Sequence, residues 1–374
     1  MLDPVIEWFG RLFASLGRGL GMVVAAIAWP FLAALRWFRG RGGFIRVAVL
    51  ALAAAFLIAN LYFAWQTQVW RGFDPAYAEA YSSVSPGISA GEQVAPEGDA
   101  TTARTCAPSR IVTATTDLTR FAVDENAWVP SMLMYKLGFF GLDWENTPFF
   151  DNKASFQRGV LSVLRRTTLE LRDVLGRERG TSAVDTDLQN AAGQFNFDDE
   201  TWYFGLDPFG PKTPTPSFYR RGARYLADFN ARLAACDATF DPRADNLVNL
   251  LDRIAKDIGD TSQSIRRRSE ISNAGWLDVR ADNEFWNSMG KLYGYYGVMR
   301  AARADFADVI ESRQVANLWD RLEEQMAAAL NLAPMIVSNG DEDGFVMPTH
   351  LTTMGFYVLR VRENMVEIRS VLDR

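Results

Sequence analysis

One apolar run near the N-terminus constrains this chain more than any other feature. Residues 47–65 read VAVLALAAAFLIANLYFAW, a run without a charged side chain. As a helix they would span roughly 30 Å, which matches the hydrocarbon core of a bilayer. We therefore expect a transmembrane helix at residues 47–65, with the lipid bilayer as its binding partner.

The basic residues around this run indicate its orientation. Arg36, Arg39, Arg41 and Arg46 precede the run, whereas Arg71 is the first basic residue after it. Segments rich in Lys and Arg stay on the cytoplasmic side of a membrane. The residues before the run are therefore expected in the cytoplasm, and the chain after Arg71 on the outer side.

A second, weaker apolar stretch leaves the number of membrane segments open. Residues 19–35 are rich in Gly and Ala and contain Pro30. They fit a helix that lies in the membrane interface, within an amphipathic leader at residues 1–46. They also fit a first transmembrane helix that would form a hairpin with the one at residues 47–65. We favour a single span, because Gly and Ala contribute little transfer free energy per residue.

The composition excludes several classes of function. Beyond residue 71 the chain has 43 acidic and 32 basic side chains, a net charge of −11, so nonspecific binding to nucleic acid is not expected. A single His excludes a His-rich zinc site, and two Cys exclude a cluster held by four thiolates. We expect no cofactor.

Apolar residues recur every three or four positions through most of the later sequence, a spacing that places them on one face of a helix. The clearest series comprises Phe285, Met289, Leu292, Tyr296, Met299, Arg303, Phe306 and Ile310, and only Arg303 breaks its apolar character. Similar series lie within residues 155–174, 217–236, 247–265, 315–330 and 351–372. These segments predict an all-α fold in which a multi-helix antiparallel bundle occupies residues 111–374.

The stretch between the membrane run and the bundle has a different composition. Residues 66–110 are rich in Ser, Pro, Gly, Ala and Thr. A segment of this kind buries little apolar area. It predicts a linker or an irregular strap that joins the transmembrane helix to the helical domain.

Three segments of the predicted bundle resemble a known family. They read DENAWVPS (124–131), SFQRGVLSVLRRTTLELRDVLGRERGTSAVDTDLQNAAGQFNFDDETW (155–202) and THLTTMGFYVLRVRENMVEIRSVL (349–372). These segments resemble the bacterial family catalogued as domain of unknown function 2333. The resemblance implies an inner-membrane helix followed by a helical domain on the periplasmic side. It implies no catalytic residues.

The two cysteines form the first candidate site. Cys106 and Cys236 both lie in the part of the chain expected outside the cytoplasm, where disulfides persist. A bridge between them would close a loop of about 130 residues and stabilise the fold by roughly 4–5 kcal/mol. The alternative is two unpaired thiols, one of them buried in a helix.

Paired carboxylates beside tryptophans form the second candidate site. Asp199 and Glu200 are the candidates for catalysis, because glycoside hydrolysis requires two carboxyl groups and often an aromatic platform. The alternative is that FNFDDETW, residues 195–202, starts a helix with acids in its first turn. The other pairs are Asp124 with Glu125, beside Trp128, and Asp143 with Glu145, beside Trp144, while Trp202 follows Glu200.

A loop with calcium-site spacing forms the third candidate site. Asn339, Asp341 and Asp343 occupy the first three ligand positions of such a loop, but His350 stands where the bidentate Glu belongs. We expect a solvated acidic turn without metal, and a capping or packing role for His350. The arginines at 266–268 fit either a phosphate or acidic partner or a solvated helix end.

These observations predict a bitopic inner-membrane protein whose periplasmic helical domain acts as a cell-envelope scaffold or binds a protein partner. The alternative is a periplasmic carboxylate-dependent hydrolase acting on envelope glycans. A third possibility is a small-molecule or lipid pocket lined by Trp and Phe. A hydrolase requires a cleft with two facing acids, whereas a scaffold requires an exposed apolar patch.

Overall fold

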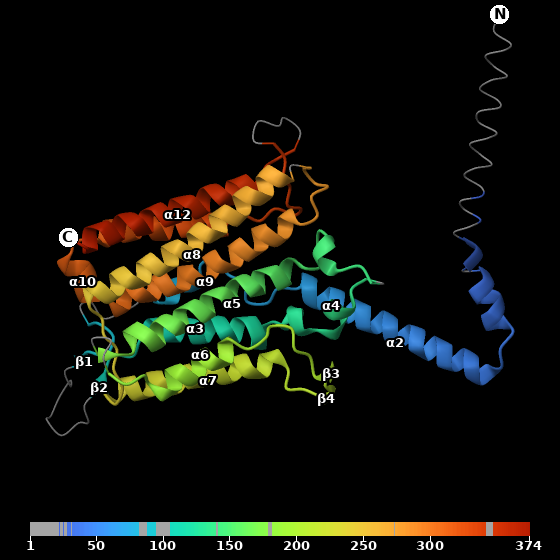
Figure 1. The fold of residues 1–374 in the computed structure, drawn as a ribbon, viewed down its shortest axis with the longest axis horizontal. Coiled ribbons are helices and arrows are strands. Elements are labelled where there is room, and N and C mark those ends of the chain that lie inside the picture. The colour runs from blue at the N-terminus through green and yellow to red at the C-terminus, as the bar shows by residue number, and fades with distance from the viewer. Residues whose placement is uncertain are drawn as a thin grey trace, which may run out of the picture. The chain divides into compact units, whose positions relative to one another are not determined.

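The structure is a computed structural model of the 374-residue chain. It describes residues 32–81, 88–94, 105–139, 141–178, 182–272, 274–341 and 347–374, and isolated positions between residues 22 and 30. The chain divides into two compact units, Met1–Tyr62 and Phe63–Arg374. It is 69% helical with almost no strands, which confirms the predicted all-α class (Figure 1).

Most of the described residues lie in helices. The long helices are α2 (Gly43–Gln68), α3 (Arg110–Arg120), α5 (Asn152–Glu170), α6 (Thr186–Phe195), α7 (Thr215–Ala234), α8 (Ala244–Ile271), α9 (Ala281–Asp305), α11 (Ala316–Leu330) and α12 (His350–Leu372). Short helices are α4 (Leu133–Leu137) and α10 (Ala307–Ser312), and π-turns at Phe121–Glu125 and Leu171–Leu175 extend α3 and α5. Two antiparallel strand pairs complete the fold: β1 (Gln93–Val94) with β2 (Thr105–Cys106), and β3 (Phe204–Leu206) with β4 (Phe209–Pro211).

Helix α2 contains the predicted membrane span. It has 26 residues and a mean hydropathy of 2.3 over its best window, so its length and composition suit a helix that crosses a membrane. Within the described part of the chain it is the one helix with these properties. Of the weaker stretch at residues 19–35, positions 22, 25, 28–30 and 32–35 are described and helical, and the others lie outside the described residues. The predicted domain boundaries stay a prediction.

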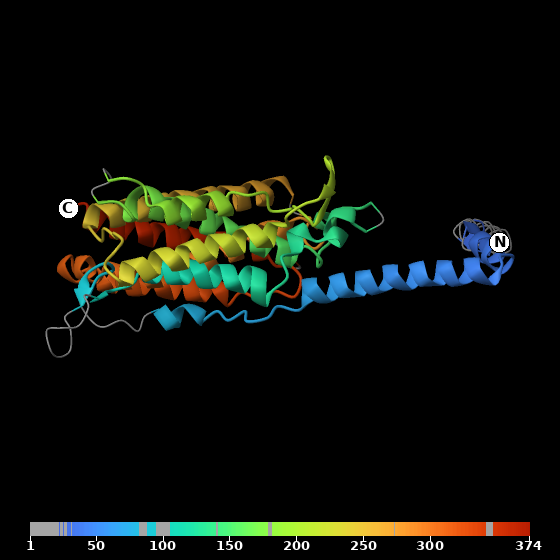
Figure 2. The same cartoon turned by 90° about the horizontal axis from the view of Figure 1, so that it is seen from below.

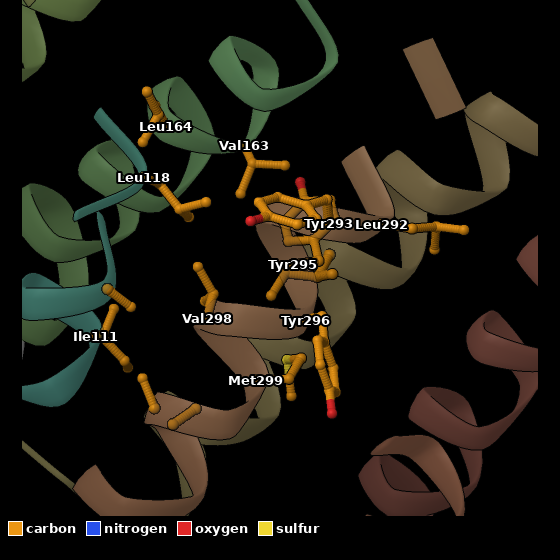
Figure 3. Packing of buried hydrophobic residues seen from close by; sticks show 14 of the residues in the cluster. Ile111, Leu118, Val163, Leu164, Leu292, Tyr293, Tyr295, Tyr296, Val298 and Met299 are labelled. Atoms are coloured by element: carbon orange, nitrogen blue, oxygen red, sulfur yellow. The ribbon is translucent and has the colours of Figure 1, made fainter. Parts of the chain in front are cut away.

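Helix α9 lies at the centre of the second unit. It packs against α3 and α5 on one side and against α8, α11 and α12 on the other (Figures 1 and 2). Because it is surrounded, it buries side chains on every face rather than along one stripe. Figure 3 shows this packing, in which Leu292, Tyr295 and Val298 are at most 1% exposed.

The apolar series predicted from Phe285 to Ile310 is interrupted in the structure. Helix α9 ends at Asp305, and a separate helix, α10, starts at Ala307. The carboxylate of Asp305 accepts hydrogen bonds from the amides of Arg110 (2.7 Å) and Ile111 (2.9 Å) at the start of α3. The prediction of one continuous helix is therefore wrong at this point, because a contact distant in sequence fixes the break.

The segment that follows α2 crosses α9 as a packed strap. Tyr77 stacks on Tyr293 with ring centroids 4.2 Å apart and donates a hydrogen bond to the Tyr293 carbonyl oxygen (2.6 Å). Phe73 stacks on the same ring at 5.3 Å. The region expected to be a linker or strap therefore contributes Ala78 and Tyr81 to the core and packs Trp70, Phe73 and Tyr77 against it, whereas residues 82–87 and 95–104 lie outside the described residues.

The helical bundle of the second unit has two distinct ends. The last residues of α2, Phe63–Gln68, lie at one end together with α4, the β3–β4 hairpin and the start of α12, and we call this the α2 end (Figure 1). The opposite end carries α10 and the β1–β2 pair, whose Cys106 forms a disulfide, and we call it the disulfide end.

Candidate functional site

The α2 end has a small hydrophobic core of its own. Phe63 is 1% exposed and packs against Val129, Trp144 and Ala154. The ring centroids of Phe63 and Trp144 are 4.9 Å apart. The last turns of the apolar helix therefore form part of the helical domain's interior.

Lys153 fixes the carboxyl end of α2 by two hydrogen bonds. Its ammonium group donates to the carbonyl oxygens of Gln66 and Val69, both at 2.9 Å. A helix leaves its last carbonyl groups without partners in the helix, and a cation there is favoured by the helix dipole. Burial of Lys153, together with the nearby charge of Arg71, lowers the pKa of its ammonium group to about 8.

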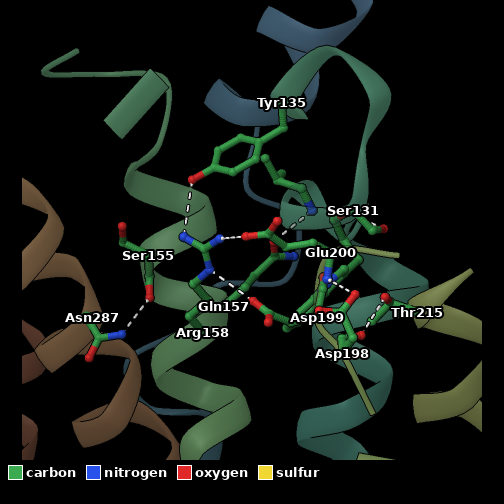
Figure 4. A network of polar contacts seen from close by, with 12 residues as sticks. Ser131, Tyr135, Ser155, Gln157, Arg158, Asp198, Asp199, Glu200, Thr215 and Asn287 are labelled. Atoms are coloured by element: carbon green, nitrogen blue, oxygen red, sulfur yellow. Dashed lines mark hydrogen bonds and ion pairs between the residues drawn. The ribbon is translucent and has the colours of Figure 1, made fainter. Parts of the chain in front are cut away.

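The candidate acids Asp199 and Glu200 meet at Arg158 of α5 (Figure 4). The guanidinium binds Asp199 through Nε (3.0 Å) and Glu200 through Nη2 (2.7 Å). Its Nη1 binds Glu145 (2.9 Å) and donates to the Tyr135 hydroxyl (3.3 Å). One planar cation thus connects three carboxylates from two distant loops, a geometry that Arg provides and Lys does not.

Local turn chemistry places the two candidate acids. Asp198 accepts hydrogen bonds from the backbone amide of Glu200 (3.2 Å) and the hydroxyl of Thr201 (2.7 Å), which forms a tight turn. The alternative in which FNFDDETW starts a helix is wrong, because α6 ends at Phe195 and the next helix starts at Thr215. The carbonyl oxygen of Asp199 accepts a hydrogen bond from the Trp128 indole (2.7 Å), and that of Asp198 accepts one from the hydroxyl of Thr215, at the start of α7 (2.8 Å).

Of the two other predicted acid pairs, one contributes Glu145 to this cluster, and the other is placed elsewhere. Asp124 pairs with Arg220 of α7 (2.6 Å). Sequence reasoning missed Arg158, because nothing in the sequence distinguishes it among 39 basic residues. Since all three carboxylates are paired with one cation, the cluster acts as an ion-pair network that ties the loops to α5.

A pair of buried acids lies beside this network and was also missed. Asp151 and Asp282 are at most 2% exposed, and neither oxygen of the Asp151 carboxyl has a hydrogen-bond partner among the described residues. Burial, reinforced by the charge of Asp282, raises the pKa of Asp151 to about 8. Burial also raises the pKa of Asp282 to about 7. The pair is therefore expected to hold at least one proton near neutral pH.

The loop with calcium-site spacing is expected to be a solvated acidic turn, and this expectation is wrong at Asn339, its first position. Asn339 is buried, and its amide nitrogen donates to the carboxylate of Asp278 (2.8 Å). His350 accepts a hydrogen bond from the Ser338 amide at Nδ1 (3.1 Å). Asp341 is exposed and Asp343 lies outside the described residues. Among the described residues no group of three or more His, Cys, Asp or Glu side chains is placed to hold a metal ion.

The structure joins Cys106 and Cys236 in a disulfide with an S–S distance of 2.05 Å. The bridge connects β2 to the residues that follow α7. Nearby, burial raises the pKa of Asp305 to about 6, although its hydrogen bonds from Ser109 and two backbone amides act in the opposite direction. The disulfide and this helix cap together hold the start of α3.

Two hollows in the second unit are lined by apolar side chains. A groove of about 510 Å³ between α8 and α12 is lined by Ile265, Gly355, Phe356 and Leu359, with Arg266 among its polar lining residues. Arg266 also pairs with Glu270 (2.7 Å). A smaller pocket of about 290 Å³ at the α2 end is lined mainly by aromatic side chains, which are Trp70, Phe73, Phe149 and Trp286.

Comparison with known proteins places the chain in a family. The family described as "Uncharacterized protein conserved in bacteria (DUF2333)" matches residues 119–273 and 261–374. No curated protein and no solved structure matches the chain. The matched residues run from the end of α3 through α12 and include Arg158 with its three acidic partners. This chain belongs to the bacterial family DUF2333.

Proposed function

We propose that this protein is a bitopic inner-membrane protein whose periplasmic helical domain acts as a cell-envelope scaffold and binds a protein partner. One observation carries the proposal. The end of the apolar helix α2 is built into the domain, with Phe63 in its interior and Lys153 bonded to the last helical carbonyls. Because the end of this helix packs inside the domain, the domain would stay at a fixed distance from the bilayer.

The orientation is supported by charge and by the disulfide. Arg36, Arg39, Arg41 and Arg46 lie before the apolar run, which favours a cytoplasmic position for that side. The bridge between Cys106 and Cys236 suits an oxidising compartment such as the periplasm. Both features favour the same arrangement.

The arrangement of the acids favours binding over glycan hydrolysis. A glycosidase uses one carboxyl group as a proton donor and another as a base or nucleophile across the sugar. Here Asp199, Glu200 and Glu145 all pair with Arg158. The groove between α8 and α12 instead offers an apolar surface of the kind that partner helices occupy.

Two fusions at the C-terminus test the orientation. Alkaline phosphatase folds only in an oxidising compartment, and green fluorescent protein fluoresces only when it folds in the cytoplasm. We expect the phosphatase fusion to be active and the fluorescent fusion to be dark at equal expression. A fluorescent C-terminal fusion with an inactive phosphatase fusion would overturn the orientation, and the periplasmic role with it.

Photo-crosslinking in intact cells tests the partner. A photoreactive residue at Phe356 or Leu359 in the groove should give one protein adduct of defined mass, whereas the same residue at Ser312 in α10 should not. The adduct should disappear when Ile265 in the groove floor is changed to Asp. If neither groove position gives a protein adduct at normal protein levels, the scaffold proposal is contradicted. The hydrolase alternative is checked separately, since D199N/E200Q should leave glycan turnover unchanged.

A further inference from the structure

The exposed large hydrophobic side chains of the helical domain are unevenly distributed. Among the described residues of the second unit, those at or above roughly 40% exposure all lie at the α2 end or on the first turns of α12. They are Trp65, Leu133, Leu137, Phe139, Leu142, Phe149, Tyr203, Phe204, Phe209, Ile271, Trp276, Leu277, Met335, Phe356 and Leu359. The disulfide end has no such side chain among the described residues.

The most exposed of these side chains lie on loops and turns that are far apart in the sequence. Phe209 of β4, in the β3–β4 hairpin, is 79% exposed, Leu277 in the turn before α9 is 81% exposed, and Met335 after α11 is 87% exposed. Leu142, in the turn after α4, is 65% exposed. Water-facing loops of a soluble domain seldom all carry large apolar residues, so this distribution indicates contact with an apolar phase.

Chain continuity places the edge of the bilayer at the same end. The apolar run of α2 finishes at Trp65, and Trp65 is an amphipathic side chain of the type enriched at membrane interfaces. Phe63 precedes it and is already packed against Trp144. Gln68, at the end of α2, is only about 4.5 Å further along the helix axis. Along the axis of α2, the lipid headgroups and the α2 end of the domain are therefore only a few ångströms apart.

We propose that the α2 end is a lipid-binding surface, in which Leu142, Phe209, Leu277 and Met335 insert into the interface of the bilayer that α2 crosses. This inference rests on the proposed membrane insertion of α2 and adds a second, independent contact with lipid. The ligand is a phospholipid surface. A lipid surface can contact apolar residues on several separate loops at once. A protein partner is better served by the continuous groove between α8 and α12.

The surface would determine how the domain stands on the membrane. A single helix leaves a domain free to tilt, whereas several inserted loops around it restrict that motion. Helix α9 has 25 residues and extends about 37 Å from the α2 end towards the disulfide end. With the α2 end on the lipid, the disulfide end projects away from the membrane.

The test uses the full chain reconstituted into vesicles of phosphatidylethanolamine and phosphatidylglycerol. A single added cysteine carries an environment-sensitive fluorophore, and labelling without reductant leaves the Cys106–Cys236 disulfide intact. The positions are F209C and L277C at the α2 end, L57C within α2, and S312C at the disulfide end. Lipids with a nitroxide near the glycerol backbone, or near the end of the acyl chain, quench the fluorophore according to its depth.

We expect shallow nitroxide lipids to quench the fluorophores at positions 209 and 277 several-fold more strongly than the one at 312. Deep nitroxide lipids should quench the fluorophore at position 57. Quenching at 57 without quenching at 209 and 277 overturns the lipid surface while α2 remains a membrane helix. Absence of quenching at 57 overturns the membrane insertion itself. Blue-shifted emission at 209 and 277 without quenching means that protein covers this end, which also contradicts the inference.

A charge-insertion variant checks that the apolar side chains cause the contact. L142D/M335D in the full chain should reduce quenching of the fluorophore at position 277 several-fold, while S312D should have no effect. Both replaced side chains are exposed, so the fold should persist, as judged by an unchanged circular dichroism spectrum. Undiminished quenching in L142D/M335D contradicts insertion of these loops.

Discussion

Gly159 of α5 and Gly290 of α9 face each other at the point where the two helices touch. A Cβ atom on Gly159 would overlap the carbonyl oxygen of Asn287, and one on Gly290 would overlap the carbonyl oxygen of Phe156. Because each glycine meets the backbone of the other helix, neither helix has a flexible side chain that could move aside. The close packing of α5 against α9 therefore requires glycine, which has no Cβ atom, at both positions.

Replacement of Gly159 by Ala should destabilise the domain by at least about 2 kcal/mol, since the new methyl group forces the helix backbones apart. G193A in α6 is the matched control, because a Cβ there meets nothing within 4 Å and a helical Gly-to-Ala change gains about 0.5–1 kcal/mol. Urea unfolding of the detergent-solubilised chain, followed by circular dichroism, measures both. Equal midpoints for G159A and the wild type would show that the helices approach less closely.

Loss of the disulfide should lower the free energy of unfolding by about 5 kcal/mol, the value for a closed loop of about 130 residues. The variant is C106S/C236S, and the separation of the two cysteines in sequence is 130. Reductant should lower the unfolding midpoint of the wild type and leave that of the variant unchanged. A wild-type midpoint insensitive to reductant, for protein purified from the membrane, contradicts the bridge.

The buried pair Asp151 and Asp282 predicts that stability falls as the pH rises. An ordinary Asp has a pKa of about 3.9 in the unfolded chain, whereas burial raises the pKa values in the folded protein to about 8 and about 7. At pH values between the pKa of the unfolded chain and those of the folded protein, the unfolded state binds fewer protons than the folded state. The free energy of unfolding therefore decreases from about pH 4 to about pH 8 and then levels off.

D151N should remove much of this decrease and be more stable than the wild type at pH 8, because Asn carries no charge. D260N, at an exposed position of α8, should follow the wild-type pH profile. Unfolding midpoints measured at several pH values distinguish the two variants. A D151N profile that is parallel to the wild type at all pH values contradicts a raised pKa for Asp151.

Helix positions were largely predictable from the sequence, because a buried helix face needs apolar residues every three or four positions. Leu351, Met354 and Val358 of α12 illustrate this, since all three are fully buried as their spacing predicts. The break after Asp305 was not predictable. Neither Gly nor Pro marks it, and its partner, the start of α3, lies about 195 positions away in the sequence.

The site could be predicted only in its acidic half. Clustered carboxylates are visible in a sequence, so Glu145, Asp199 and Glu200 could be named, but the cation that joins them was not visible. Arg158 reaches Glu145 across 13 positions and Glu200 across 42. Such pairs form only when the bundle brings α5 against two loops, and no local pattern encodes that approach.

Lys153 should hold the end of α2 against the domain. In K153M the carbonyls of Gln66 and Val69 lose their donor, which costs about 1–2 kcal/mol because both acceptors are partly buried. Hydrogen exchange should accelerate in residues 66–73 and remain unchanged in α9. The control K256M removes a solvent-exposed ammonium group of α8 and should alter neither segment. Exchange in residues 66–73 that equals the wild-type rate would show that the two hydrogen bonds are dispensable.

Replacement of Arg158 by Met should destabilise the domain by about 1–3 kcal/mol, because three partly buried carboxylates would then repel one another without a cation. The expected loss of stability is smaller than for a fully buried ion pair, since Glu145 and Glu200 are nearly half exposed. R158K keeps the charge but cannot contact all three acids, so its stability should lie between that of R158M and the wild type.

The acids provide the control for this experiment. If the cost of R158M comes from unpaired carboxylates, E145Q/E200Q should be less harmful in the R158M background than in the wild type. A double-mutant cycle of unfolding free energies measures this coupling. Additive effects would mean that the three acids do not act through Arg158. The cluster could then no longer be treated as an ion-pair network, and the acids would again be available for chemistry at the α2 end.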